Sequence, residues 1–230
     1  MVSLHSKNSL DTRVDTAADR LRITEIFYSL QGESRTVGVP TVFIRLTGCP
    51  LRCVYCDTRY AFRGGEWLDI HEVLTEVAGY NPLYITITGG EPLAQRQCRP
   101  LLAALCDEAY KVSLETSGAV TLEDIDPRVS IVMDIKTPGS GEGDRNLREN
   151  IQLLRAKDQV KFVLLDRTDY EWARETLREY GLSSVCEVLF SPVDKKLNPT
   201  DLAEWILEDH LAVRMQIQLH KILWNGAHGR

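Results

Sequence analysis

Short runs of β-branched and aliphatic residues alternate with amphipathic stretches along nearly all of the 230-residue chain. This alternation is typical of α/β domains with a largely parallel sheet, because each strand needs a crossover connection before the next parallel strand. The strands predicted from these runs cover residues 41–46, 84–88, 112–115, 131–135, 160–165, 185–190 and 215–219. The fold is therefore either an open doubly wound sheet or a barrel shorter than the eight-stranded one.

Helix signals separate several of these runs. Asp69 can cap a first helix, Thr168 a second that Gly181 ends, and Thr200 opens a third behind Pro199. In both candidate folds, ligands bind beyond the carboxyl ends of the parallel strands. The polar residues that follow the strands are therefore the first candidates for chemistry.

Charge and hydropathy exclude several classes of protein. The chain has 27 Lys and Arg against 33 Asp and Glu, a formal charge of -6, so it lacks the positive field that gathers nucleic acid. The first twenty residues show no secretory signal, and no span of about 18 apolar residues predicts a membrane helix. We expect a cytoplasmic protein that binds neither nucleic acid nor membrane, with a flexible tail over residues 1–21, one domain over 22–225 and a short tail over 226–230.

Three of the six cysteines crowd together after the first predicted strand. The segment Gly48–Thr58 reads GCPLRCVYCDT, which spaces Cys49, Cys53 and Cys56 as C-x3-C-x2-C. A [4Fe-4S] cluster takes four ligands, so three cysteines on one loop leave one iron open to a small-molecule chelate. The alternative is a structural zinc knuckle with a distant fourth ligand, although no second C-x2-C or H-x3-H pair follows.

The cysteine loop resembles that of the radical S-adenosylmethionine superfamily, including the aromatic Tyr55 before the third cysteine. Thr88–Pro92, TGGEP, follows the next predicted strand and is similar to the superfamily's GGEP motif. The resemblance implies that the open iron binds S-adenosylmethionine, and that one electron cleaves the cofactor to a 5'-deoxyadenosyl radical. It also implies an α/β fold, a partial, incomplete TIM-like (β/α)6 barrel with mostly parallel strands.

Polar ends of later strands fit the same cofactor site. Each such residue has an ordinary alternative as a turn or cap residue, but together they lie at the ends of successive predicted strands. By resemblance, the residues expected to contact S-adenosylmethionine are Tyr55, Gly90, Glu91, Ser117, Asp134, Ile135, Lys136, Ser191 and Pro192.

The amino-terminal motif narrows the resemblance. Phe27–Glu33 reads FYSLQGE and, with CDT after the cluster and TGGEP, resembles the 7-carboxy-7-deazaguanine synthases from about residue 22 to about residue 225. This family implies a carbon–nitrogen lyase of queuosine and 7-deazapurine biosynthesis. Its members contract the ring of 6-carboxy-5,6,7,8-tetrahydropterin to give 7-carboxy-7-deazaguanine and ammonia, after hydrogen abstraction at C6.

A flat, amide-rich bicycle with a carboxylate needs in-plane donors and acceptors and one cation. By resemblance, the residues expected to bind this substrate are Leu30, Gln31, Gly32, Glu33, Arg45 and Thr88. Arg45 has an alternative as the partner of a strand-edge ion pair. Its direction depends on strand register, because a slip of one residue would turn its side chain to the other face.

Thr58, in the CDT triplet, is expected by resemblance to bind a Mg²⁺ that bridges to the substrate. Mg²⁺ keeps several waters and few protein oxygens. One hydroxyl is a sparse ligand, so the substrate and water would supply most of the coordination. The alternative is that Asp57 or Thr58 is an ordinary turn or cap residue.

Resemblance also predicts a flavodoxin or ferredoxin as the electron donor, and a homodimer. The remaining cysteines, Cys98, Cys106 and Cys186, are expected to be reduced core residues. Two other functions stay open at this point. One is a glycyl-radical-enzyme activating protein of the same superfamily, and the other is a metal-stabilised binding module without catalysis.

Overall fold

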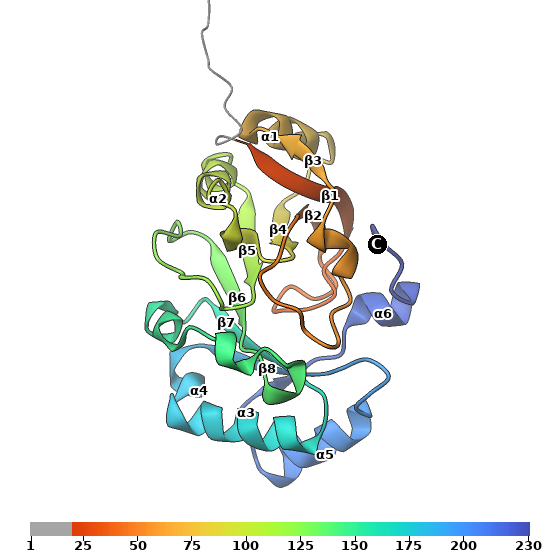
Figure 1. The fold of residues 1–230 in the computed structure, drawn as a ribbon, viewed down its shortest axis with the longest axis vertical. Helices are drawn as coiled ribbons and strands as arrows, with labels where there is room; N and C mark the ends of the chain where they lie inside the picture. The colour runs from red at the N-terminus through yellow and green to blue at the C-terminus, as the bar shows by residue number, and fades with distance from the viewer. Residues whose placement is uncertain (1–19) are drawn as a thin grey trace, which may run out of the picture.

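The computed structural model describes residues 20–230, and a nine-stranded sheet runs through them (Figure 1). The strand order is β3-β1-β2-β4-β5-β6-β7-β8-β9; pairing is parallel from β2 to β9 and antiparallel between β1 and its neighbours β2 and β3. The strands are β1 Leu21–Leu30, β2 Pro40–Leu46, β3 Glu66–Leu68, β4 Tyr84–Gly89, β5 Lys111–Thr116, β6 Ser130–Asp134, β7 Gln159–Leu164, β8 Glu187–Pro192 and β9 Arg214–Met215.

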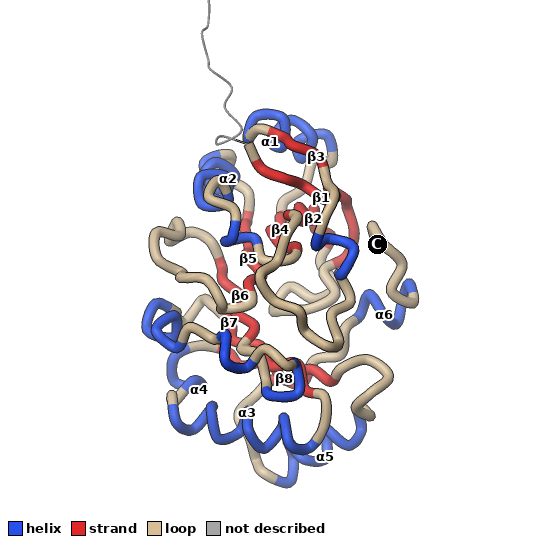
Figure 2. Tube along the Cα trace, in the orientation of Figure 1, coloured by secondary structure: helices blue, strands red, loops and turns tan. Residues whose placement is uncertain are grey.

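The sheet does not close, because β3 and β9 are its two edges. Its six longer parallel strands are β2 and β4 to β8, which confirms the predicted partial barrel with mostly parallel strands. Two crossovers differ from a regular (β/α) unit. The chain passes from β5 to β6 without a helix and from β6 to β7 through short 3₁₀ turns only (Figure 2).

The α-helices are α1 Ile70–Gly79, α2 Cys98–Asp107, α3 Arg167–Glu179, α4 Leu182–Val185, α5 Pro199–Glu208 and α6 Leu219–Trp224. Helices α1 to α5 lie along the outer side of the curved sheet, and α6 lies on the open side with the C-terminus (Figure 1). None of the helices in the described part of the chain is long and apolar enough to cross a membrane.

The predicted caps are partly right. Asp69 caps α1 in a capping box with Glu72, as expected. The second helix is capped by Asp166, not Thr168, and begins at Arg167. The third is capped by Asn198. In both cases an Asx side chain just upstream accepts a backbone N–H of the first turn, and this favours the earlier start.

The predicted strand 215–219 is wrong beyond its first residue. Only Arg214–Met215 pairs with β8, and α6 begins at Leu219. The Gln216 N–H still donates to the Phe190 carbonyl of β8 at 2.9 Å, and from there the chain is held against the turn after β1. Gln216 exchanges side-chain hydrogen bonds with the backbone of Ser34, and the Leu219 N–H donates to the Gly32 carbonyl at 3.0 Å.

Successive side chains along the strands point alternately to the two faces of the sheet, so the apolar core lies on one face and polar residues on the other. On β4, Ile85 and Ile87 are fully buried in the core cluster that includes Leu101 and Leu105 of α2. Polar residues alternate with these core residues along the inner strands. The concave face therefore carries the polar side chains Thr86, Thr88, Glu115, Asp134 and Lys161.

The second of the two expected tails lies wholly within the described residues, and the first only at its inner end. Residues 1–19 lie outside the described residues, and Leu21 is already a fully buried residue of β1. At the other end, the His228 ring stacks on the Tyr60 ring with their centroids 4.0 Å apart. The segment 226–230 therefore packs against the domain at the mouth of the site.

Candidate functional site

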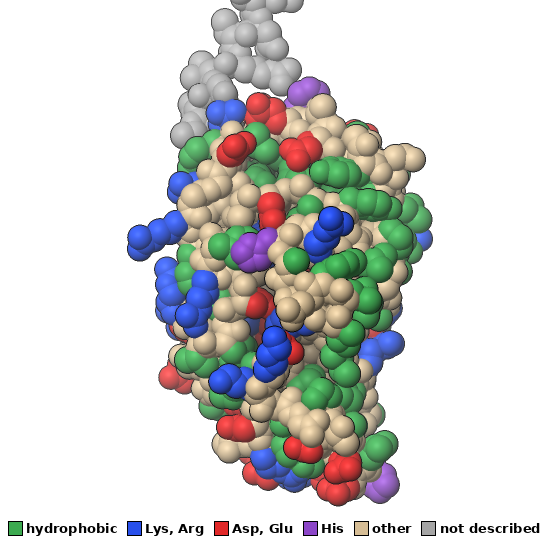
Figure 3. All heavy atoms as spheres, turned by 90° about the vertical axis from the view of Figure 1, so that its right-hand side faces the viewer, with side chains coloured by type: hydrophobic (Ala, Val, Ile, Leu, Met, Phe, Trp, Pro, Cys, Tyr) green, Lys and Arg blue, Asp and Glu red, His purple; other side chains and the backbone are tan. Residues whose placement is uncertain are grey.

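A pocket of about 270 Å³ lies at the carboxyl ends of the parallel strands, bordered by the cysteine loop, α6 and the C-terminal segment. Acidic and basic side chains gather around a hollow on this side of the molecule (Figure 3). All six predicted substrate residues, the three loop cysteines and Thr58 line it. So do five predicted cofactor residues, Tyr55, Gly90, Ser117, Asp134 and Lys136. Four others do not, namely Glu91, Ile135, Ser191 and Pro192.

Two glycines allow the motifs to approach one another. A Cβ on Gly90 would come within 2.1 Å of the Gly48 carbonyl oxygen, so the GGEP turn can lie against the cysteine loop only with glycine there. A Cβ on Gly32 would come within 2.3 Å of His220 Nδ1. The SLQGE turn and α6 therefore meet at the edge of the pocket.

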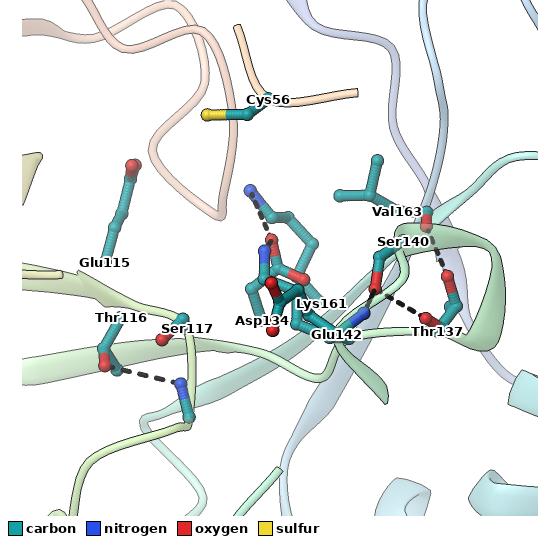
Figure 4. A network of polar contacts seen from close by, with 12 residues as sticks. Cys56, Glu115, Thr116, Ser117, Asp134, Thr137, Ser140, Glu142, Lys161 and Val163 are labelled. Atoms are coloured by element: carbon teal, nitrogen blue, oxygen red, sulfur yellow. Dashed lines mark hydrogen bonds and ion pairs between the residues drawn. The ribbon is translucent and has the colours of Figure 1, made fainter. Parts of the chain in front are cut away.

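The cysteine loop is held by its neighbours and not by a disulfide. Cys49, Cys53 and Cys56 are free and half-buried. The Glu91 N–H donates to the Gly48 carbonyl at 2.8 Å, and the Val54 N–H donates to the Ser140 carbonyl at 3.0 Å. Figure 4 shows Cys56 with its sulfur pointing toward the side on which Glu115 ends its strand.

The three thiols fit a cluster better than a single ion. Burial raises the pKa of the Cys49 and Cys53 thiols, so metal binding must displace their protons. Among residues 20–230, no three His, Cys, Asp or Glu side chains converge closely enough to hold one metal ion. Thiolates that bind different irons of a cubane lie farther apart than those around one zinc ion. No cysteine in this described part lines the pocket besides these three, so one iron would stay open.

Cys98, Cys106 and Cys186 are buried away from the pocket, as predicted for core residues. Burial raises the pKa of the Cys186 thiol to about 11. These thiols are therefore poor nucleophiles and poor metal ligands at neutral pH.

At the far side of the pocket, Arg45 points inward. It lies opposite Thr88 in the parallel pairing of β2 with β4, and both side chains line the pocket. The Arg45 Nε donates to Glu25 at 2.7 Å, which leaves the terminal nitrogens of the guanidinium for a ligand. The guanidinium also lies 5.7 Å from the centroid of the Phe27 ring and 5.8 Å from that of Tyr60. Both alternatives for Arg45 therefore hold together: it is ion-paired and it faces the site.

A buried carboxyl group completes this side. The Thr88 hydroxyl donates to Glu115 at 3.0 Å, and the Gln31 amide donates to Glu115 at 3.2 Å and to the Thr86 hydroxyl at 3.1 Å. Burial raises the pKa of Glu115, and the nearby Glu33 carboxylate adds to this. Glu115 is thus a candidate hydrogen-bond donor as well as an acceptor.

Comparison with known proteins decides the family. Residues 43–133 match the family described as Radical SAM superfamily. The 7-carboxy-7-deazaguanine synthase of Koribacter versatilis is 44% identical over 219 residues, which covers 89% of this chain and 97% of the relative. That of Chlorobaculum tepidum is 43% identical over 208 residues, with 89% and 94% covered. The chain belongs to the 7-carboxy-7-deazaguanine synthase family. This membership confirms the resemblance and decides against the activating-enzyme and binding-module alternatives.

The fold agrees with this membership. The crystal structure of QueE from Escherichia coli superposes with a TM-score of 0.73, covering 87% of this chain and 95% of that one. At 24% sequence identity, this likeness concerns the fold alone. Members of the radical SAM superfamily use a [4Fe-4S] cluster and S-adenosylmethionine, and the cysteine loop of this family member fits such a cluster.

The Glu91 carboxylate forms its hydrogen bonds with other residues of the protein. It is fully buried and accepts hydrogen bonds from the Ser117 N–H at 2.7 Å, the Ser117 hydroxyl at 2.5 Å and the Leu93 N–H at 3.0 Å. The Thr116 hydroxyl lies 2.9 Å and 3.0 Å from its two oxygens. Glu91 therefore fastens the turn after β4 to the end of β5, and Gly90, not the Glu91 side chain, faces the pocket.

Two of the other predicted cofactor residues outside the pocket also have their side chains engaged elsewhere. Ile135 belongs to the core cluster, and the Ser191 hydroxyl donates to the Gln216 carbonyl at 2.7 Å. By contrast, Lys136 lines the pocket and its Nζ lies 2.9 Å from Asp134 Oδ2 (Figure 4 shows Asp134 at the end of its strand). Burial would lower the pKa of Lys136, but the charges of Asp134 and Cys53 raise it. The other oxygen, Asp134 Oδ1, is buried with no partner among the described residues, which makes it an open acceptor for a ligand.

Sequence reasoning did not select Glu25, Tyr60, Glu115, Lys161, Gln218 or His220 for the site, all of which contact predicted site residues or line the pocket. Glu115 had a signal, because it ends a predicted strand. Glu25 and Lys161 had none, since a single charged residue within a strand is also typical of a solvent-facing position.

Proposed function

We propose that this enzyme converts 6-carboxy-5,6,7,8-tetrahydropterin to 7-carboxy-7-deazaguanine with loss of ammonia, in queuosine and 7-deazapurine biosynthesis. The observation that supports it most is one pocket with a free cysteine triad at one side and, facing it, Arg45 among hydrogen-bonding groups. Such a site suits a small planar acid placed next to a radical source.

The cofactor side is supplied by the loop and the strand ends. Cys49, Cys53 and Cys56 would hold the cluster, which with S-adenosylmethionine supplies the radical that removes the C6 hydrogen. The open oxygen of Asp134 suits an ammonium or hydroxyl donor, and Lys136 suits a carboxylate. Glu91, Ile135, Ser191 and Pro192 act indirectly, by holding the strand ends that shape this side.

The substrate side is read by hydrogen bonds. Arg45 would bind the substrate carboxylate, with Glu25 and the two aromatic rings fixing its guanidinium. Gln31, Glu33 and Thr88 would bind the polar edge of the pterin, and Leu30 and Gly32 would contribute backbone groups. Because the pocket is partly enclosed by the C-terminal segment, these bonds form in a medium of lower dielectric than water.

Thr58 is proposed as the protein ligand of Mg²⁺. It precedes the 3₁₀ helix Arg59–Phe62, yet its side chain makes no capping hydrogen bond. Its neighbour Asp57 is ion-paired with Lys221 at 2.9 Å. The Thr58 hydroxyl lies 3.7 Å from Cys56 Sγ, beside the cysteine loop, and substrate and water would complete the coordination of a Mg²⁺ bound there.

A flavodoxin or ferredoxin donor, a homodimer and a cytoplasmic location complete the proposal. The central test is anaerobic incubation of the reduced, reconstituted enzyme with S-adenosylmethionine and the carboxytetrahydropterin. We expect both 5'-deoxyadenosine and 7-carboxy-7-deazaguanine by liquid chromatography and mass spectrometry. Formation of deoxyadenosine without the deazaguanine would refute this substrate, and formation of neither would refute the activity.

We predict that Arg45→Gln raises the KM for the carboxytetrahydropterin by about 10- to 100-fold, because one charge-assisted hydrogen bond to the carboxylate is lost. Steady-state kinetics measure this, with Arg178→Gln as the control, since Arg178 is an exposed residue of α3. If Arg45→Gln changes kcat but leaves KM at the control value, Arg45 does not bind the substrate carboxylate.

A further inference from the structure

Lys161 is a buried cation on the inner face of the sheet, at the bottom of the pocket. It lies on β7 with 8% of its surface exposed, and its Nζ is ion-paired with Glu33 Oε2. Asp134 Oδ2 lies 3.9 Å from the same nitrogen, and Figure 4 shows these two side chains next to each other. A buried lysine destabilises the folded protein unless its charge is paired. The pairing of Lys161 with carboxylates inside the pocket therefore suggests that the lysine serves the site.

Each oxygen of the Glu33 carboxylate is bound by a different side chain. Lys161 reaches one carboxylate oxygen, and the Gln218 amide donates to the other at 2.5 Å. Both partners come from segments far along the chain, and the Glu33 backbone N–H also donates to the Gln31 side chain at 3.1 Å. The carboxylate therefore has a fixed plane at the wall of the pocket, and each of its oxygens keeps a further lone pair for a ligand.

The pterin offers a matching edge. Its 2-amino-4-oxopyrimidine ring presents the ring N–H and the 2-amino group side by side, which are two parallel donors. An ionised carboxylate accepts such a pair in bidentate fashion, whereas a protonated carboxyl group offers only one acceptor oxygen of comparable strength. Recognition of this edge therefore depends on the charge and the plane of Glu33.

We propose that Lys161 is a positioning residue that keeps Glu33 ionised and oriented, so that Glu33 selects substrates carrying the 2-amino-4-oxopyrimidine edge. This inference rests on the proposed function, because it assumes a pterin in the pocket. Lys161 itself acts through Glu33 and does not touch the substrate.

The charges around Glu33 determine the pH range in which it is ionised. Burial alone would raise the pKa of Glu33, but the charges of Lys161 and His220 and the hydrogen bonds it accepts lower it to about 2. The nearby Glu115 carboxyl group acts in the opposite direction on the pKa of Glu33. The Lys161 ammonium group also interacts with the Asp134 carboxylate. Wild-type Glu33 is thus ionised throughout the neutral range. Without Lys161, burial and Glu115 remain, so the pKa of Glu33 rises and Glu33 gains a proton as the pH falls.

The test measures binding of 6-carboxypterin, the fluorescent, unreactive oxidised analogue, to the reconstituted enzyme with S-adenosylmethionine and no reductant. For the wild type, we expect an affinity that hardly changes between about pH 6 and pH 8 and that falls by about tenfold or more for 6-carboxylumazine, which lacks the 2-amino group. For Lys161→Met, we expect binding about tenfold weaker at pH 8, weaker still at pH 6, and little preference between the two analogues.

Matched variants separate this role from others. Lys111→Met removes an exposed lysine from the start of β5 and should behave as the wild type. In a double-mutant cycle, adding Lys161→Met to Glu33→Gln should cause no further loss, because Lys161 acts only through the Glu33 charge. Lys161→Arg keeps the charge and should restore the flat pH profile.

Several outcomes would overturn the inference. One is that Lys161→Met binds both analogues with the wild-type affinity and pH profile. Another is that Lys161→Met loses as much affinity in the Glu33→Gln background as alone, which would mean direct contact with the ligand. If Lys161→Met does not fold because Glu33 is left as an unpaired buried charge, two other variants test the inference. The double variant Lys161→Met with Glu33→Gln has no such charge and is compared with Glu33→Gln alone, and Lys161→Arg is compared with the wild type. Failure of the wild type itself to bind 6-carboxypterin would count against the proposed function instead.

Discussion

Replacing Cys53 with alanine is expected to remove the [4Fe-4S] cluster and to lower 5'-deoxyadenosine formation below detection. The three proposed ligands of the cluster lie on one loop, and no other cysteine in the described chain lines the pocket to replace a lost one. Iron and sulfide content, visible absorbance after anaerobic reconstitution, and the electron paramagnetic resonance of the reduced protein measure the loss.

The matched control is Cys106→Ala. Cys106 lies in α2, is 7% exposed and belongs to the core, so this variant should keep the cluster and the activity and lose only about 1 kcal/mol of stability. A Cys53→Ala protein with the wild-type iron content and signal would show that the loop does not hold the cluster. Loss of the cluster in the Cys106 variant would place a ligand outside the loop.

Replacing Glu91 with glutamine is expected to cost about 3 kcal/mol of unfolding free energy, since a fully buried carboxylate loses part of a set of charge-assisted hydrogen bonds. For a chain of this size, that lowers the Tm by about 6 to 12 °C. Because Glu91 fastens Gly90 and Ser117 at the pocket wall, affinity for S-adenosylmethionine should also fall, by about tenfold or more.

Thermal unfolding and equilibrium binding of S-adenosylmethionine to the reconstituted protein measure these two effects. Glu108→Gln, at an exposed position just after α2, makes the same chemical change and should alter neither. If Glu91→Gln weakens cofactor binding at unchanged Tm, the carboxylate contacts the cofactor directly, as the sequence motif alone suggests, and the internal role derived from the structure is wrong.

The parts of the site that were predictable lie close together in the sequence. Cys49, Cys53 and Cys56 come from one loop, and Thr88 and Gly90 from one strand end, so their spacing alone indicates the chemistry. Local signals also located most strands and the capping box of α1. These signals were least reliable where contacts between distant residues decide the secondary structure. At Leu219, for example, the backbone N–H donates to the Gly32 carbonyl, and a helix begins there in place of the predicted strand.

The parts that were not predictable are contacts between distant residues. Lys161 meets Glu33 across 128 positions, and Gln218 meets Glu33 across 185. Nothing in the residues next to Lys161 shows that its strand turns this lysine inward while the neighbouring Val160 and Phe162 enter the core. Only the register and curvature of the sheet decide which alternate residues share the concave face.

By itself, the sequence determined an α/β fold with a mostly parallel sheet and a three-cysteine loop, because strand periodicity and ligand spacing are local properties of a chain. The choice of a partial barrel over an open doubly wound sheet came from the family resemblance of its motifs. The tertiary structure alone decided which charged side chains surround the pocket and which hold its walls in place. It turned Glu91 inward as a structural group, Arg45 toward the pocket, and Lys161 toward Glu33. Such pairings arise when strands far apart in the chain become neighbours, and their energies depend on burial that exists only after folding.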